Sequence, residues 1–222
     1  MKTLLFAIHY LELGGAERSL IGLLRALDYS KVQVDLFVYS HRGELMKEIP
    51  QEVNLLPEIP EYAQIERPLK EVLKDGYLRL FLARIKAKWL FAKYKKQNHP
   101  KDGNAIFSYV AKNVTPLLPP INPDKEYDLA VSFLAPHDIV LNKVNARKKA
   151  CWVHTDYTKV VINTDIELPI WSQYDHIAAV SEGVAEAFIQ RFSSLRENVD
   201  IIPNIIDTQY VQEQSRAFDV KA

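Results

Sequence analysis

The first forty residues alternate between apolar runs and an amphipathic segment, and this alternation limits the possible folds more than any other feature of the chain. Residues 4–8 (LLFAI) form an unbroken apolar run, as expected for a strand that is buried on both faces. The pair Gly14–Gly15 ends this pattern, and from Ala16 onward leucines recur on one helical face. Residues 32–39 (VQVDLFVY) predict a second strand. Two strands joined through a helix favour a parallel pair with a right-handed crossover.

Apolar runs of strand length return later in the chain. They lie at residues 53–56, 128–133, 149–154, 176–181 and 199–202. Short segments at 44–49 and after Ser181 predict helices, and the Ser181 hydroxyl is suited to cap the second of them. Strands that alternate with helices define an α/β fold, so we predict a Rossmann-like, doubly wound and mainly parallel sheet.

Residues 57–123 interrupt the alternation and predict a helical insertion between two strands. Prolines indicate an irregular start to this stretch, and further prolines lead from its end back to the sheet. Between them, residues 70–98 predict a long helical region that is broken near Gly76. We therefore assign residues 1–207 to one Rossmann-like domain that contains the insertion.

The charge of the chain is balanced overall and concentrated in the insertion. Lys and Arg number 28, and Asp and Glu also number 28, which argues against a globally basic nucleic-acid-binding protein. Between Arg67 and Lys101, however, eleven basic residues are opposed only by Glu71 and Asp75. A stretch of this charge is suited to an anionic membrane surface or an anionic acceptor.

An apolar row runs through this basic stretch at helical spacing. Its members are Leu78, Leu82, Ile85 and Trp89. One interpretation is a helix that lies at a lipid surface, with its aromatic residues at the interface. The alternative is a solvated helix whose apolar face packs on the protein's own sheet. The two interpretations differ in whether this row is exposed.

The cysteine content and the N-terminus predict a compartment. The single cysteine, Cys151, excludes an intramolecular disulfide and a cysteine-based zinc site, and it favours a reducing environment. The N-terminal apolar run is too short for a signal peptide, and no run approaches the roughly 18 apolar residues of a membrane span. We predict a cytoplasmic protein, peripheral on the inner face of the cell membrane if the insertion binds lipid.

The pair Gly14–Gly15 is a candidate anion site, because a helix N-terminus favours phosphate and glycine lets a ligand approach the backbone. The segment does not follow the GxGxxG or Walker A pattern. Tyr39-Ser40 end the second strand where an NAD-linked oxidoreductase would carry an acidic residue, which disfavours that class. By itself the glycine pair is equally compatible with a plain strand-to-helix turn.

Three segments, in order and spacing, resemble the retaining glycosyltransferases of family 4, which have the GT-B fold. They are residues 14–20 (GGAERSL), 177–183 (IAAVSEG) and 199–207 (VDIIPNIID), with Ile205 where that family usually has a glycine. The resemblance covers nearly the whole chain and implies the N-terminal, acceptor-side domain of a two-domain enzyme. Because the sequence ends fifteen residues after Asp207, it also implies that residues 208–222 begin an interdomain linker and that the C-terminal donor-binding domain is absent.

The resemblance assigns roles to residues that end strands or begin helices. It makes His154 the catalytic candidate, which would position the donor sugar or stabilise charge on the leaving phosphate. It also brings the amides of Gly14 and Gly15 toward the donor diphosphate. Further candidates for the cleft are His9, Glu17, Arg18, Asp156, Ser181 and Asn204, with His137 and Asp138 as an additional pair.

Several of these residues also have local explanations. Glu17 suits the dipole of its helix, Asp156 is equally placed to cap the next segment, and Ser181 is placed to cap its helix. No cluster of metal ligands is visible in the sequence. The resemblance implies no metal and no cofactor beyond a UDP- or GDP-sugar, which is the donor substrate.

Taken together, these inferences predict the acceptor-binding half of a glycosyltransferase that moves a sugar to a surface-glycan or lipid-linked acceptor. This half alone is expected to be inactive. Two alternatives stay open: half of a GT-B sugar-nucleotide epimerase, and a non-catalytic Rossmann-like ligand-binding module. Nucleic acid is not expected as a partner.

Overall fold

The computed structural model describes residues 1–100, 102–205, 208, 212 and 215–216. Their central feature is a seven-stranded sheet in which every pair of neighbours is parallel. The strands are β1 (Lys2–Ile8), β2 (Val32–Val38), β3 (Asn54–Leu55), β4 (Tyr127–Ser132), β5 (Ala146–Val153), β6 (His176–Ala179) and β7 (Val199–Ile201). Their order is β3-β2-β1-β4-β5-β6-β7, which confirms the predicted doubly wound α/β sheet. The order reverses between β1 and β4, where sheets of this kind open a crevice at the carboxyl ends of their strands.

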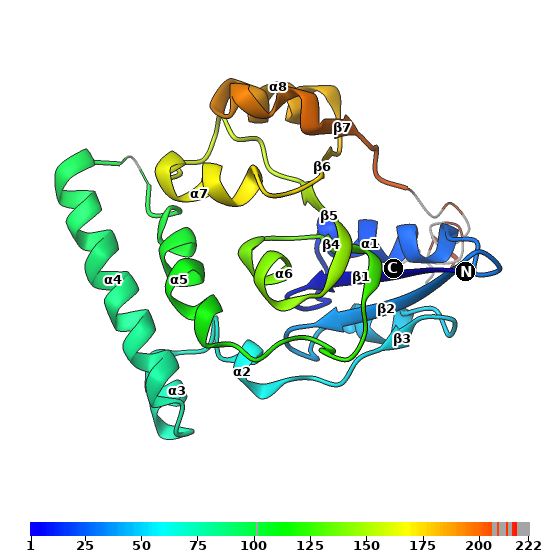
Figure 1. Ribbon diagram of the computed structural model, residues 1–222, viewed down its shortest axis with the longest axis horizontal. Coiled ribbons are helices and arrows are strands. Elements are labelled where there is room, and N and C mark those ends of the chain that lie inside the picture. Colours follow the sequence, from blue (N-terminus) through cyan, green and yellow to red (C-terminus); the bar gives the residue numbers. More distant parts are fainter. Residues whose placement is uncertain (101, 206–207, 209–211, 213–214, 217–222) are drawn as a thin grey trace, which may run out of the picture.

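Helices cover both faces of the sheet (Figure 1). The α-helices are α1 (Gly15–Ala26), α2 (Pro60–Ala63), α3 (Leu69–Lys74), α4 (Leu78–Asn98), α5 (Ile106–Val114), α6 (Asp138–Lys143), α7 (Thr164–Trp171) and α8 (Glu182–Arg191). Short 3-10 turns lie at η1 (Glu44–Glu48), η2 (Thr115–Leu117) and η3 (Ser193–Asn198). The helices α2, α5, α6 and α7 were not predicted, because segments of four to nine residues contain too few turns for a clear periodicity. In the described part of the chain, no helix is both long enough and apolar enough to span a bilayer.

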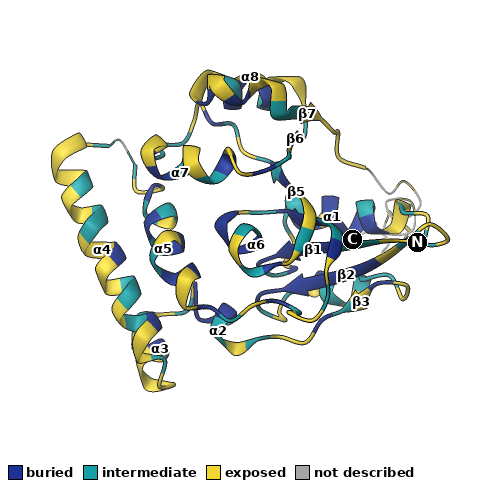
Figure 2. Ribbon diagram, viewed as in Figure 1, coloured by how far each residue is buried: buried dark blue, intermediate teal, exposed yellow. Residues whose placement is uncertain are grey.

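Alternate residues of β1 enter two hydrophobic clusters on opposite faces of the sheet. Leu5 lies in the cluster that contains Ile139 of α6, whereas Phe6 lies in the cluster that contains Leu20 and Leu24 of α1. The strands are therefore buried on both sides, as Figure 2 shows for the centre of the molecule. This two-sided burial explains the continuous apolar run of β1 at residues 4–8.

Helices α2 to α5 lie between β3 and β4 in the chain, within the predicted insertion. The predicted break in the long helical region is confirmed, because α3 ends at Lys74 and α4 begins at Leu78. Between them Gly76 has a φ of 86°, a conformation that favours glycine. In Figure 1, α4 is the outermost helix, with α5 beside it.

The apolar row of α4 does not pack on the sheet, so that expectation is wrong. Its members are 42–64% exposed: Leu78, Leu82, Ile85 and Trp89. The helix instead buries Leu80 and Ala87, and further along it packs on α5, where the rings of Phe91 and Tyr109 are 5.8 Å apart. Helix α4 therefore packs through an apolar face that does not contain the predicted row.

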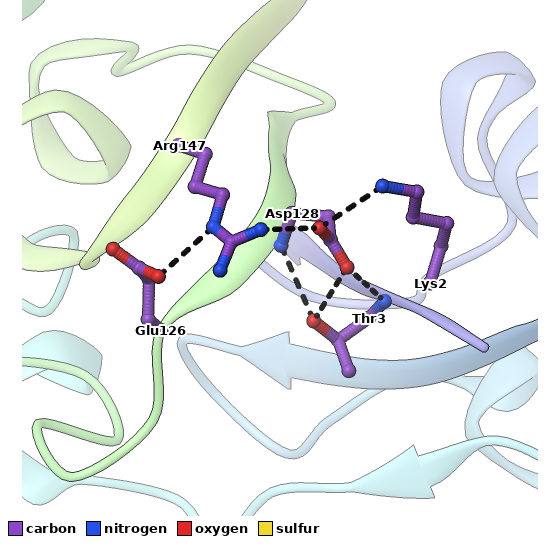
Figure 3. A network of polar contacts seen from close by, with 5 residues as sticks. All are labelled: Lys2, Thr3, Glu126, Asp128 and Arg147. Carbon is purple, nitrogen blue, oxygen red and sulfur yellow. Dashed lines mark hydrogen bonds and ion pairs between the residues drawn. The ribbon is translucent and has the colours of Figure 1, made fainter.

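The amino ends of three neighbouring strands are joined by a polar network (Figure 3). Asp128 of β4 accepts a hydrogen bond of 2.9 Å from the backbone N–H of Thr3, and it pairs with Lys2 at 3.3 Å. Arg147 of β5 bridges Asp128 and Glu126. The arginine and lysine of this network are largely exposed, so it contributes little to stability, but it aligns β1, β4 and β5 at the edge opposite the crevice.

One charged side chain lies inside the sheet. Asp35 of β2 is 1% exposed and accepts hydrogen bonds from Asn54 (3.0 Å), Lys125 (2.9 Å) and the hydroxyl of Tyr127. Burial raises the pKa of Asp35, but the hydrogen bonds from Tyr127, Asn54 and Lys125 outweigh it and hold the pKa below its ordinary value. The carboxylate thus connects β2, β3 and β4.

Candidate functional site

A cavity of about 540 Å³ opens at the carboxyl ends of β1 and β4, where the strand order reverses. His9 directly follows β1, and His137 and Asp138 follow β4, so the two central strands bring these side chains into one lining. Helices α4, α5 and α7 close the other sides. The lining is mainly apolar, with a few polar groups, which is the usual composition of a small-molecule site.

Three histidines follow three neighbouring strands: His9 after β1, His137 after β4 and His154 after β5. Burial lowers the pKa of His9 to about 4, with Arg42 as a second cause. Burial also lowers the pKa of His137 to about 3, and the charges of His154 and His9 add to this shift. His137 is thus close enough to both neighbours to interact with them, and at neutral pH the rings are uncharged.

His9 and His137 are held by several contacts. Nδ1 of His137 lies 2.8 Å from the hydroxyl oxygen of Ser132, and its ring centre is 4.4 Å from that of Trp171. Nε2 of His9 lies 3.4 Å from a carboxylate oxygen of Glu66, whose pKa is raised chiefly by burial. Both imidazoles therefore have defined orientations in the cavity wall.

His154, the predicted catalytic residue, is placed differently. Its ring packs at 4.8 Å from that of Phe133, and it does not line the cavity. Burial lowers the pKa of His154 to about 4. A hydrogen bond with the backbone of Phe133 raises the pKa but does not offset the effect of burial. Its Nε2 is buried and has no hydrogen-bond partner in the described part of the chain. A neutral ring of this kind is suited to hold a sugar by a hydrogen bond, but it brings no positive charge to a phosphate.

Asp138 is the most unusual polar group of the cavity. It is 6% exposed, and one carboxylate oxygen accepts a hydrogen bond of 3.3 Å from Thr115. The other, Oδ1, is buried without a hydrogen-bond partner among the described residues. Burial raises the pKa of Asp138 to about 6. A buried, incompletely paired carboxyl in a cavity marks a candidate binding residue.

This carboxylate should reduce the stability of the protein. Because its pKa is higher in the folded chain than in the unfolded chain, stability falls as pH rises through about 6. We expect Asp138→Asn to raise the free energy of unfolding by about 2 kcal/mol at about pH 8, and by much less at about pH 4.5. Urea unfolding at both pH values measures the difference.

Asp165→Asn is the matched control, because Asp165 also begins a helix but is exposed. The three histidines have lowered pKa values and therefore the opposite pH dependence, so wild type and variant must be compared at each pH. An equal effect of Asp138→Asn at both pH values would contradict the assignment.

Glu167 is a cavity residue that sequence reasoning missed. Its carboxylate accepts hydrogen bonds from Ser108 (2.7 Å) and from Nε1 of Trp171 (3.3 Å), and burial raises its pKa. In the sequence, Glu167 stands out only as an acidic residue between two apolar ones shortly before Pro169. A glutamate on the solvent face of a helix gives the same pattern, so the sequence does not mark it as a cavity residue.

The glycine turn lies outside this cavity. Gly14 is the N-cap of α1, and the carboxylate of Glu17 folds back over it, so that a Cβ on Gly14 would lie 2.1 Å from the Glu17 carboxylate. Glu17 is buried, whereas Gly15 and Arg18 are exposed. A phosphate at this turn would have to displace or avoid that carboxylate.

Asn204 contacts helix α1 shortly after the glycine turn, whereas Asp156 and Ser181 have local structural roles. The Ser19 hydroxyl donates a 2.6 Å hydrogen bond to Oδ1 of Asn204, which brings the third sequence segment to the first turn of α1. Asp156 accepts a 2.9 Å hydrogen bond from the backbone N–H of Thr158, and Ser181 caps α8. Residues 206–207 and most of the predicted linker at 208–222 lie outside the described residues.

Within the described chain, no group of three or more His, Cys, Asp or Glu side chains is arranged to hold a metal ion. The polar groups of the cavity include neutral imidazoles, the buried carboxyl of Asp138 and the less buried carboxyls of Glu66 and Glu167, with Arg84 and Lys88 of α4 also in the lining. Such a set can hydrogen-bond to hydroxyl groups, and the exposed ring of Phe107, which also lines the cavity, can contact an apolar ring face.

The parallel sheet, the strand reversal and the cavity at the carboxyl edge together define a Rossmann-like α/β protein. Comparison with known proteins found no matching protein-family model and no matching curated protein. Among solved structures, the chain is similar to Alr3699/HepE from Anabaena, in complex with UDP and glucose (13% identity, TM-score 0.49) and in complex with UDP-glucose (14% identity, TM-score 0.48). Each match covers 97% of this chain and 50% of the other, so the chain spans about half the length of these structures.

Proposed function

We propose that this chain is the acceptor-binding half of a retaining glycosyltransferase with the GT-B fold. The full reaction would transfer a sugar from a UDP- or GDP-linked donor to a surface-glycan or lipid-linked acceptor. The observation that carries this proposal is the cavity at the strand reversal, with the neutral imidazoles of His9 and His137 and the incompletely paired carboxyl of Asp138 in its lining.

The three sequence segments that resemble family 4 support the same function. The hydrogen bond between Ser19 and Asn204 brings the first and third of them into contact. The second lies at the carboxyl end of β6, on the same sheet edge as the cavity. Residues that are distant in sequence therefore belong to one side of the molecule, where a donor-binding lobe would face them.

The chemistry of the site suits the recognition of a hydroxyl-bearing acceptor. Asp138 Oδ1 can accept a hydrogen bond from an acceptor hydroxyl, and the exposed ring of Phe107 in the same lining can contact the face of a sugar. In the transfer step, the bond from the sugar C1 to the donor phosphate would break as the acceptor oxygen bonds to C1. The hydroxyl proton would leave with the diphosphate. By the family 4 resemblance, His154 would hold a donor hydroxyl by a hydrogen bond, which requires its buried Nε2 to become accessible when the donor and the donor-binding lobe are present.

The test uses the protein that carries this chain together with a donor-binding lobe, assayed for release of UDP or GDP from nucleotide sugars with and without glycolipid acceptors. We expect His154→Ala to lower kcat about 100-fold, because an active-site hydrogen bond lost in the transition state typically has an effect of this size. The 222-residue chain alone should release no nucleotide.

His176→Ala is the control, because His176 is exposed and begins β6 at the opposite edge of the sheet. Thermal unfolding must show that both variants are folded. Unchanged turnover by folded His154→Ala would instead favour the non-catalytic ligand-binding module. Interconversion of two sugar epimers without an acceptor would favour the epimerase.

A further inference from the structure

Helix α4 has two apolar faces, and only one of them packs on the protein. Successive residues of an α-helix are about 100° apart, so positions two residues apart lie on nearly opposite sides. Leu78 and Leu82 each lie two residues from the buried Leu80, and Ile85 and Trp89 each lie two residues from the buried Ala87. The exposed row therefore points directly away from the packed face.

The exposed row is large and continuous. Trp89 is 64% exposed, and Leu78, Leu82 and Ile85 are between 42% and 55% exposed. Because α4 is the outermost helix in Figure 1 and packs through its other side, this row faces away from the rest of the molecule. Exposed apolar rows of this kind indicate an interaction surface.

The charges around the row identify the partner. Helix α4 contains no acidic residue and these seven basic ones: Arg79, Arg84, Lys86, Lys88, Lys93, Lys95 and Lys96. Three of them, Arg79, Lys86 and Lys93, recur at a spacing of seven and so run alongside the apolar row. All three are exposed, and none takes part in a salt bridge with another described residue.

We propose that α4 docks on an anionic lipid bilayer and lies in the plane of the interface. We call the four apolar residues and their three basic neighbours the α4 docking face: Leu78, Arg79, Leu82, Ile85, Lys86, Trp89 and Lys93. The apolar side chains would enter the boundary between headgroups and acyl chains, while the basic side chains would contact the headgroups. A second copy of this chain is a poor partner, because two such faces would bring like charges together.

The docking face and the cavity share one helix. Arg84 and Lys88 of α4 line the cavity, and each is next to a residue of the apolar row, Ile85 or Trp89. Membrane docking does not depend on the proposed function. If that function also holds, docking would hold the cavity one helix away from the surface on which a lipid-linked acceptor resides.

The experiment is co-sedimentation of the protein with vesicles of phosphatidylcholine, alone or mixed with phosphatidylglycerol. We expect binding to the mixed vesicles to be at least about tenfold stronger than to phosphatidylcholine, and to weaken as salt is added. We expect the double variant Leu82→Glu/Trp89→Glu, and separately Arg79→Glu/Lys86→Glu/Lys93→Glu, to lose at least about tenfold in affinity. The melting temperature should be unchanged, because all of these side chains are exposed.

Ile201→Glu is the matched control, because Ile201 is 49% exposed on β7 and lies far from α4 in the fold (Figure 1). It should bind like the wild type. Tryptophan fluorescence is an independent readout: vesicles should shift the emission to shorter wavelength, and Trp89→Phe should abolish the shift while binding persists. Equal binding to neutral vesicles would overturn the proposal. So would full binding by Leu82→Glu/Trp89→Glu, because a purely electrostatic surface, such as one that binds RNA, would not need the apolar row.

Discussion

Replacing Asp35 by alanine should lower the free energy of unfolding by about 4 kcal/mol, because breaking a buried ion pair from one side leaves the remaining groups uncompensated. The carboxylate is 1% exposed and is the acceptor for Asn54, Lys125 and Tyr127. Without it, the hydroxyl of the fully buried Tyr127 keeps a single hydrogen-bond partner among the described residues, Asn122. Urea or thermal unfolding of the variant measures the loss.

Asp124→Ala is the control for this variant, because Asp124 is an exposed carboxylate on the neighbouring loop and should change stability by less than about 0.5 kcal/mol. The pH dependence provides a second check. Because the pKa of Asp35 is lowered in the folded chain, its stabilising effect is present above its ordinary pKa and is lost as pH falls through the folded value. The difference between wild type and Asp35→Ala should therefore shrink in acid. A loss below about 1 kcal/mol at neutral pH would show that the network is not needed for stability.

Replacing Trp171 by alanine should cost about 4 kcal/mol, the usual range for removing a large aromatic side chain from a core. Trp171 is 2% exposed at the end of α7, and its ring packs edge-on at 4.9 Å from Phe188 of α8. The centre of the same ring lies 4.4 Å from that of His137, and its Nε1–H donates a hydrogen bond to the carboxylate of Glu167. The variant should therefore also enlarge the cavity and free one hydrogen-bond acceptor inside it.

Trp89→Ala removes the same side chain from an exposed position and should change stability by less than about 0.5 kcal/mol. Trp171→Phe retains most of the packing, so its loss of stability should lie between those of Trp171→Ala and Trp89→Ala. Unfolding of all three variants in urea makes the comparison. If Trp171→Ala and Trp89→Ala had similar effects, the aromatic cluster behind the cavity would not be a packed core.

The strands were predictable because their signal is local. Residues 4–8 are an apolar run and residues 32–39 are a mainly apolar segment, and a sheet that is buried on both faces requires segments of this kind. The break at Gly76 was predictable for a similar reason, because glycine weakens a helix in any context. The end of one helix before Gly76 and the start of the next one after it are visible in the sequence without knowledge of distant residues.

The cavity was predictable only in part. His9 and His137 were candidates because each follows a predicted strand, but the sequence separates them by more than half of the chain. Their meeting depends on β1 and β4 being neighbours, which the order of strands along the chain does not specify. Glu66 and Glu167 come from a loop and from an unpredicted helix, so no local pattern pointed to them.

The sequence by itself determined the alternation of strands and helices, the glycine turn and the basic helix with its apolar row, because these depend on residues within a few positions of one another. Only the tertiary structure decided that α4 packs through a second apolar face and leaves that row exposed. It also decided that three histidines from separate parts of the chain, two of them buried, become uncharged neighbours at the carboxyl ends of the strands. Burial is a property of what surrounds a side chain, and most of those surroundings come from residues that are distant in sequence.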